Sequence, residues 1–171
     1  RAVFTLYPNP ATDRLTLENF ATVLGTVGLP QAFLNSSIVA VLTTLLSLTI
    51  AVPAAYVSTL YRRRITTLFL LFALVTRMVP AVSLGVPLLQ LLKSLGLLDT
   101  TLGLVLAHTS GAVPLALLLM AAFFEGVPKD LEEAARMDGC TRFRAFVHII
   151  LPVMRGGMAI TALFSFIASW N

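Results

Sequence analysis

Long apolar stretches without charge alternate with short polar segments along this chain. The run at 38–60 has 23 residues. As a helix it reaches about 34 Å, enough to cross a hydrocarbon core of about 30 Å. Further apolar runs occupy about 66–86, 101–124 and 156–171. The pattern predicts an all-α, polytopic transmembrane helix bundle with four spans at these positions.

Prolines and capping residues subdivide this pattern. Asn35 and Ser36 can cap the start of the first span, and Pro53 predicts a kink within it. The second run is expected to form a helix that breaks near Pro80. The stretch LKSLGLLDTTLG, at 92–103, has the composition of a turn region before the third span.

The first 34 residues mix polar and apolar positions. Four apolar residues there follow the i, i+3, i+4, i+7 spacing of one helix face: Leu17, Phe20, Ala21 and Leu24. They predict a short amphipathic helix at the membrane surface. No signal peptide is recognisable at Arg1, and both ends look cut. The chain is therefore expected to be a fragment that lacks its first span and its C-terminal part.

Composition supports a membrane protein. The chain is 57% hydrophobic and 12% charged, whereas soluble domains carry about 25% charged residues. Eight Lys or Arg fall on one predicted side of the membrane: Arg62, Arg63, Arg64, Lys129, Arg136, Arg142, Arg144 and Arg155. Three fall on the other: Arg1, Arg14 and Lys93. The side with eight is expected to be cytoplasmic, which leaves residues 1–34 outside.

The cytoplasmic loop, residues 125–155, has the features of two helices joined by a glycine. Pro128 and three early carboxylates, Asp130, Glu132 and Glu133, suit a helix N-terminus. Leu131, Ala134, Ala135 and Met137 give this helix an apolar surface. Gly139 is a natural stop because glycine adopts the left-handed conformation at little cost.

A second helix is predicted after this glycine. Thr141 can cap it, and an apolar stripe follows at Phe143, Phe146, Val147 and Ile150, with Pro152 limiting its extension. Three interpretations fit this loop. It could be a hairpin that closes the bundle, a DNA-binding helix-turn-helix, or a docking element for a cytoplasmic partner. The second is disfavoured, because a helix that leads into a membrane span could not easily enter a major groove.

The loop resembles the EAA loop of ABC importer permeases, whose pattern is EAA-x3-G-x9-I-x-LP. The residues that match are Glu133, Ala134, Ala135, Gly139, Ile149, Leu151 and Pro152. Weaker similarity to carbohydrate permeases of the maltose and glycerol-phosphate type lies in Asn35-Ser36, Ala54-Ala55-Tyr56, residues 95–100 and Trp170-Asn171.

This resemblance implies a permease subunit of the plasma (inner) membrane that performs no chemistry and needs no cofactor. Its implied partners are a second permease subunit, cytoplasmic ATPase subunits, an external solute-binding protein and the lipid bilayer, but no nucleic acid. The matching residues would form the ATPase-coupling turn, with Glu133 paired to a basic residue of the ATPase. The sequence contains no G-x-x-x-x-G-K-[ST] phosphate loop.

Arg77 and Pro80 are candidates for the substrate path. An arginine within a span costs about 2.5–3.5 kcal/mol, so Arg77 should face protein or a water-filled cavity. It could contact a sugar hydroxyl or an anionic substrate, or it could bond to backbone carbonyls loosened at Pro80. Such permeases more often carry an uncharged polar residue at this position.

His108 is the other polar residue of note within the predicted spans. No acidic or cysteine partner stands at metal-ligand spacing from it, so no metal site is expected. The sequence leaves two alternatives to an importer subunit. One is an ion-gradient-driven secondary transporter that uses Arg77 and His108 for ion coupling, and the other is an intramembrane enzyme that uses His108.

Overall fold

The computed structural model describes residues 20, 25, 28–61, 64–128 and 130–170, which fall into two units, 1–35 and 36–171. In the first unit, the predicted amphipathic helix lies outside the described residues apart from Phe20. The described part of this unit contains the beginning of α2 (Leu29–Leu60), where Gln31 Nε2 donates to Asn35 Oδ1 at 3.2 Å.

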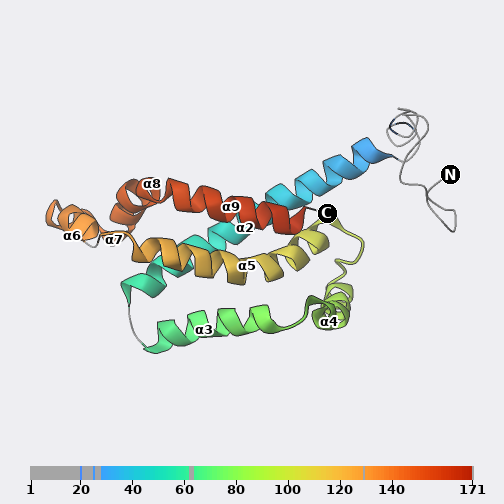
Figure 1. The fold of residues 1–171 in the computed structure, drawn as a ribbon, viewed down its shortest axis with the longest axis horizontal. Helices are drawn as coiled ribbons and strands as arrows, with labels where there is room; N and C mark the ends of the chain where they lie inside the picture. The colour runs from blue at the N-terminus through green and yellow to red at the C-terminus, as the bar shows by residue number, and fades with distance from the viewer. Residues whose placement is uncertain (1–19, 21–24, 26–27, 62–63, 129, 171) are drawn as a thin grey trace, which may run out of the picture. The chain divides into compact units, whose positions relative to one another are not determined.

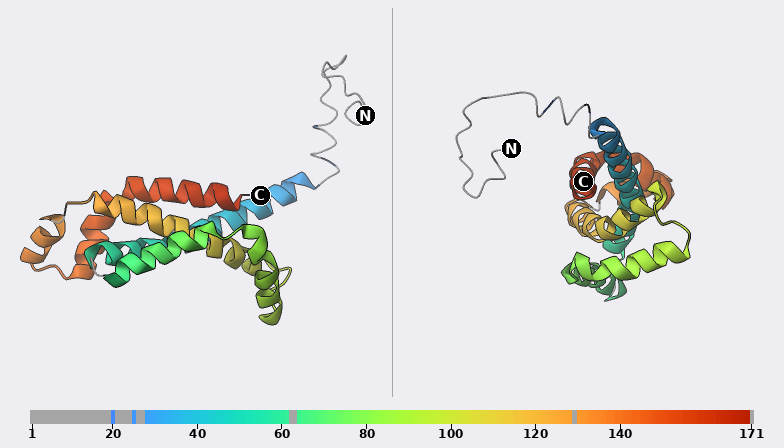
Figure 2. Two further views of the ribbon diagram at one scale, coloured as in Figure 1. Left: turned by 60° about the horizontal axis from the view of Figure 1, so that its bottom comes forward. Right: turned by 90° about the vertical axis from the view of Figure 1, so that its right-hand side faces the viewer.

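The second unit is helical in all its described secondary structure, which confirms the all-α prediction (Figure 1). After α2 come α3 (Arg64–Met78), α4 (Ala81–Ser94), α5 (Thr101–Glu125), α6 (Asp130–Met137), α7 (Arg142–Ala145), the π-helical turn η2 (Phe146–Ile150), α8 (Leu151–Val153) and α9 (Arg155–Ser169). α5 packs against α3 on one side and α9 on the other. Figure 2 shows α4 turned away from the direction of α3.

Small residues form much of the core between these helices. One buried cluster joins α2, α3, α5, η2 and the turn before α9: Ala51, Val52, Ala55, Ala73, Ala116, Leu117, Met120, Ala121, Phe124, Ile150 and Met154. Alanines allow helix backbones to approach closely, which is how membrane helices associate when water supplies no hydrophobic driving force. Large apolar side chains such as Leu45, Phe72 and Leu163 are instead exposed on the surface of the bundle.

Several hydroxyl groups are buried in this core. Most bond to a carbonyl one turn earlier in their own helix; Thr44 donates to Ala40 O at 2.7 Å and Thr109 to Val105 O at 2.7 Å. Such bonds allow Ser and Thr to sit in an apolar interior without an unsatisfied donor. Thr161 of α9 donates to its own helix and also lies 3.4 Å from the sulfur of Met120, which is fully buried in α5.

α2 begins earlier than the sequence predicts. Asn35 and Ser36 lie inside the helix and do not cap it, so that assignment is wrong. The start is set by Gly28, with φ of 63°, and by Pro30 in the first turn, where the missing N–H costs nothing. Gln31 N and Ala32 N both bond to Gly28 O.

The predicted break at Pro80 is present. α3 ends at Met78, α4 begins after Pro80, and the two helices are bent by 103°. α4 continues to Ser94, beyond the expected end near residue 86. It stops at Gly96, with φ of 69°, because the next amide, Leu97 N, bonds back to Leu92 O.

Two described helices, α2 and α5, are long and apolar enough to cross a membrane. Two further pairs of helical segments are long enough only if each pair is taken as one broken span. The first pair is α3 with α4, and the second is Arg142–Val153 with Arg155–Ser169, which are bent by 74°. The four-span boundaries therefore remain a prediction.

The packing of α9 on α5 depends on a glycine. A Cβ at Gly157 would lie 2.9 Å from Phe123 Cγ and 3.1 Å from Phe123 Cβ. We expect Gly157→Ala to destabilise the full-length protein by about 1–3 kcal/mol through overpacking, measured as a lower thermal unfolding midpoint in detergent. Gly156→Ala is the control, since no described atom lies within 4 Å of its added Cβ. Equal midpoints for the two variants would contradict this account of the interface.

Candidate coupling site

α6 forms where the sequence places carboxylates and a basic residue at opposite ends. Asp130, Glu132 and Glu133 occupy its first turn, and Arg136 lies in its last turn. The helix dipole interacts favourably with negative charges at the N-terminus and with positive charges at the C-terminus, so both groups stabilise α6. The chain enters α6 through Pro128, whose carbonyl accepts a bond from Leu131 N at 3.3 Å.

Gly139 ends α6 in a Schellman motif. Its φ is 85°, in the left-handed region. Cys140 N donates to Ala135 O at 3.0 Å, and Gly139 N donates to Arg136 O at 3.1 Å. This pair of bonds satisfies two of the carbonyls that a helix end leaves free. The prediction of a glycine stop here is confirmed.

Thr141 caps the next helix, as predicted. Its side chain accepts a bond from Arg144 N at 3.3 Å. After one α-helical turn the chain widens into η2, where Leu151 N bonds to Phe146 O. This wide turn precedes Pro152, which lies inside α8 and does not end the helical path. A wider turn relieves the clash that a proline makes with the carbonyl four residues before it.

The wide turn also corrects the predicted apolar stripe. Phe143 is 75% exposed and does not share a face with Ile150, which is 3% exposed. The buried residues of this segment are Ala145, Ile150 and Met154, and half-buried Phe146 and Leu151 also pack against the core. On α6, Ala135 is buried against the bundle, while Leu131, Ala134 and Met137 remain exposed. The sequence had assigned Ala135 to the same apolar surface as its neighbours.

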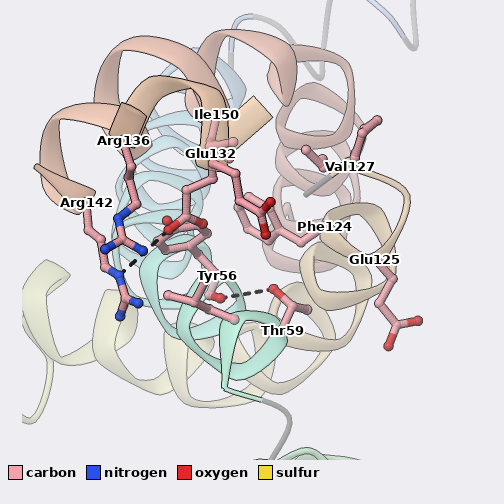
Figure 3. A pocket seen from close by; sticks show the side chains of 12 residues that line it. Tyr56, Thr59, Phe124, Glu125, Val127, Glu132, Arg136, Arg142 and Ile150 are labelled. Atoms are coloured by element: carbon pink, nitrogen blue, oxygen red, sulfur yellow. Dashed lines mark hydrogen bonds and ion pairs between the residues drawn. The ribbon is translucent and has the colours of Figure 1, made fainter. Parts of the chain in front are cut away.

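A pocket of about 290 Å³ lies between α6–α7 and the ends of α2 and α5 (Figure 3). Acidic, basic and aromatic side chains line it together. The lining residues are Tyr56, Thr59, Leu60, Phe124, Glu125, Val127, Pro128, Glu132, Glu133, Arg136, Arg142 and Ile150. The sequence singled out Glu133 of this set for a binding role; the residues from α2 and α5 are distant in the chain and gave no such signal.

The charged wall of the pocket contains an ion pair. Arg142 Nε lies 3.9 Å from Glu132 Oε1, and Arg142 Nη1 donates to the hydroxyl of Tyr61. The guanidinium carbon also lies 5.6 Å from the centre of the Tyr61 ring. Glu133 is exposed, and among the described residues its carboxylate forms no ion pair.

Aromatic rings form the floor of the same region. Tyr56 of α2 stacks on Phe146 of η2, with centroids 4.5 Å apart, and meets Phe124 of α5 at 5.8 Å. Such ring pairs contribute about 0.5–1.5 kcal/mol beyond their buried area. The other matched residues, Ile149, Leu151 and Pro152, are half-buried beneath the turn.

The candidate path residues lie elsewhere. Arg77 is exposed at the end of α3, and its Nη1 donates to Gly111 O of α5 at 3.2 Å. This carbonyl, and none at Pro80, is its partner among the described residues. Pro80 is exposed at the break between α3 and α4, and His108 is half-buried in α5. The described His, Cys, Asp and Glu residues form no group of three that could hold a metal ion.

Long apolar helices that end in a charged helix–glycine–helix segment define an integral membrane protein with an exposed element at one end of its bundle. The chain belongs to the family of binding-protein-dependent transport system inner membrane components, which it matches over residues 45–171.

Individual relatives carry the similarity through nearly the whole chain. It is 36% identical to the alpha-glucoside transport system permease protein AglG of Rhizobium meliloti, covering 100% of this chain and 46% of the relative. It is 34% identical to the trehalose transport system permease protein SugB of Mycobacterium tuberculosis, covering 92% and 57%. The chain spans about half the length of these curated relatives.

A solved structure shows the same fold. It is a bacterial ABC transporter involved in the import of the acidic polysaccharide alginate, and one of its chains superposes with a TM-score of 0.75 at 27% identity. The match covers 89% of this chain and 53% of that chain.

The turn at Gly139 can be tested through its backbone conformation. No described atom lies within 4 Å of a Cβ added there, so strain at φ of 85° is the expected cost of Gly139→Ala, about 1–2 kcal/mol. Faster hydrogen exchange at the backbone amides of positions 139 and 140 should result, because these amides close the motif. Gly126→Ala, at φ of −79°, is the control and should leave both rates unchanged. Unchanged rates in Gly139→Ala would refute the strain argument.

Proposed function

We propose that this chain is the membrane-spanning permease subunit of an ATP-binding-cassette importer, that it forms part of the path for a sugar or related solute, and that its EAA loop, residues 125–155, couples to a separate cytoplasmic ATPase. The observation that carries this proposal is the surface of α6 and α7. Leu131, Ala134, Met137 and Phe143 are exposed together with Glu133 on a segment that is otherwise polar.

This surface has the composition of a protein-docking site. Met137 is 88% exposed and Phe143 is 75% exposed, and an apolar side chain in water gains from burial in a partner. Methionine and aromatic residues are enriched in the centres of interfaces, with charged groups at the rim. The element is also held from behind by buried Ala135 and Ile150, so docking would not require it to be ordered first.

Sugars are the solute class favoured by similarity. The relatives AglG and SugB are named for the transport of alpha-glucosides and of trehalose, and the solved transporter is involved in the import of an acidic polysaccharide. These names belong to those proteins. For this chain they support a carbohydrate or a related polyol, carried after delivery by an external binding protein.

Purification of the full-length protein from its source membrane tests the proposal. We expect an ATPase subunit, a second permease subunit and a solute-binding protein to be recovered with it. Uptake that requires ATP and these partners would support the importer. Uptake that needs no ATPase and collapses with the ion gradient would instead establish the secondary transporter, and recovery of no partner would favour a loop that only closes the bundle.

Glu133 provides the sharper arm of this test. Glu133→Lys reverses the charge of an exposed carboxylate, and we expect recovery of the ATPase to fall roughly tenfold or more, equivalent to about 1.4 kcal/mol. Glu133→Gln should give a smaller loss. Membrane insertion should be unchanged, since the residue lies outside the apolar helices.

Asp99→Asn is the matched control for Glu133→Gln. It also removes one exposed carboxylate, but at the turn before α5. Asn tolerates the φ of 56° found there. Full ATPase recovery with both Glu133 variants would exclude Glu133 from the docking surface.

We further propose that Arg77 lines the solute path beside Pro80. Its guanidinium is exposed within an apolar segment and uses one described contact, to Gly111 O, so other donors can face a water-filled passage. Arg77→Gln should raise the solute concentration for half-maximal uptake roughly tenfold, as for loss of a charged hydrogen bond worth about 1.5–3 kcal/mol. Arg77→Lys, which keeps the charge, should lose less. Unchanged uptake with lower thermal stability would assign Arg77 a structural role.

A further inference from the structure

Arg142 joins three elements that the sequence separates. It is the first residue of α7, and its guanidinium contacts Glu132 of α6 and Tyr61 at the end of α2. Figure 3 shows the side chains of Glu132 and Arg142 pointing toward one another across the pocket wall. We name Glu132, Arg142 and Tyr61 the arginine clamp.

Burial makes the clamp more than a surface ion pair. The Glu132 side chain is 12% exposed and that of Arg142 is 46% exposed. A carboxylate this far removed from water needs a compensating charge, and it is destabilised when that partner is removed. The separation of 3.9 Å is long for a hydrogen-bonded pair, so the bond to Tyr61 and the ring contact give the guanidinium its remaining orientation.

A second contact between the same parts of the fold supports the clamp. Tyr56 lies near the end of α2, shortly before Tyr61 in the chain. Its ring stacks on Phe146 of η2. The end of α2 is therefore held at two places, by ring stacking on η2 and by the Arg142 contact of α7. Neither contact involves α5, the helix that leads into α6 along the chain.

Backbone connections alone would leave α6 free to pivot. It is reached from α5 through the turn at Gly126–Pro128 and is left through the turn at Gly139. When a short helix between two turns is displaced, contacts between its side chains and those of a neighbouring helix transmit the displacement. Within the described residues, the clamp is the charged link from α6 to α2.

We propose that Arg142 is a positioning residue that ties the coupling helix α6 to α2, so that displacement of α6 by the ATPase moves α2 with it. This inference rests on the proposed function. It assigns to Arg142, and to its contacts with Glu132 and Tyr61, the transmission step between docking at α6 and rearrangement of a membrane helix.

The test separates docking from transmission in the full-length protein complexed with its ATPase. Spin labels on cysteines placed at Leu45 of α2 and Leu163 of α9, both exposed, report the distance between these helices, with Cys140 and any other native cysteine replaced by Ser. The probe is Mg-ATP with vanadate, which needs no knowledge of the solute. In the wild-type background we expect ATP to shift the distance distribution.

Arg142→Ala should keep ATPase recovery within about twofold of wild type. It should reduce the ATP-dependent change in the equilibrium constant between the two distance populations roughly fivefold or more, which is the lower end of the usual range of allosteric coupling. Arg142→Lys should retain part of the shift, because an ammonium can hold Glu132 but lacks the planar fork that also reaches Tyr61. Tyr61→Phe keeps the ring but removes the hydroxyl acceptor, and it should show an intermediate loss.

Arg144→Ala is the matched control. Arg144 lies on the same short helix and is exposed, and among the described residues its side chain makes no hydrogen bond or ion pair. It should leave the shift unchanged. A double variant, Glu132→Gln with Arg142→Ala, should lose no more than Arg142→Ala alone if the two residues act as a unit.

The outcomes distinguish the two proposals. A wild-type protein that recovers no ATPase overturns the proposed function itself. A wild-type protein that binds the ATPase and shifts with ATP, beside Arg142→Ala and Tyr61→Phe variants that shift equally, overturns the clamp and leaves the importer intact. If Arg142→Ala fails to fold, Arg142→Lys and Tyr61→Phe decide the question.

Discussion

A hydrocarbon core offers no water to backbone N–H and C=O groups, and this constraint accounts for most of the fold. Helices satisfy these groups internally, and buried hydroxyls such as those of Thr44 and Thr109 are satisfied by the same helices. Small side chains such as Gly157 then bring α9 close to α5. Where the pattern must break, as at Pro80, the chain changes direction and begins a new helix.

The same constraint gathers charge outside the apolar helices. Between α5 and α9 the backbone is free to turn, and it does so with Gly139 in the left-handed region and Thr141 as a cap. The resulting segment presents one side to the bundle through Ala135 and Ala145, both buried. Its other side carries the exposed residues that suit a partner. An eight-residue helix such as α6 is too short to be stable alone. The rigidity of this segment therefore comes from packing and from the arginine clamp.

Features fixed by local chemistry were predictable, and those fixed by distant contacts were not. The stop at Gly139 depends on one residue's conformational freedom, so the sequence reveals it. The sequence offers two possible starts for α2, one at Asn35-Ser36 and one at Gly28–Pro30. Local capping preference alone could not decide between them. Phe143 and Ile150 do not share a face, since a π-helical turn, which no 3.6-residue pattern contains, follows Phe143. The bond from Arg142 to Tyr61 joins residues 81 positions apart, and nothing in the sequence around either residue indicates it.

Adjacent carboxylates show why a motif match does not assign roles by itself. Successive residues on a helix point about 100° apart, so Glu132 and Glu133 cannot face the same surroundings. Glu132 is directed into the pocket wall, is largely buried and pairs with Arg142. Glu133 is the one that remains exposed. A carboxylate that already has an ion-pair partner inside the protein has little left to offer another chain, whereas an exposed carboxylate is available to an interface. Helix geometry thus explains why Glu132 pairs within the protein while Glu133, the next residue, faces outward.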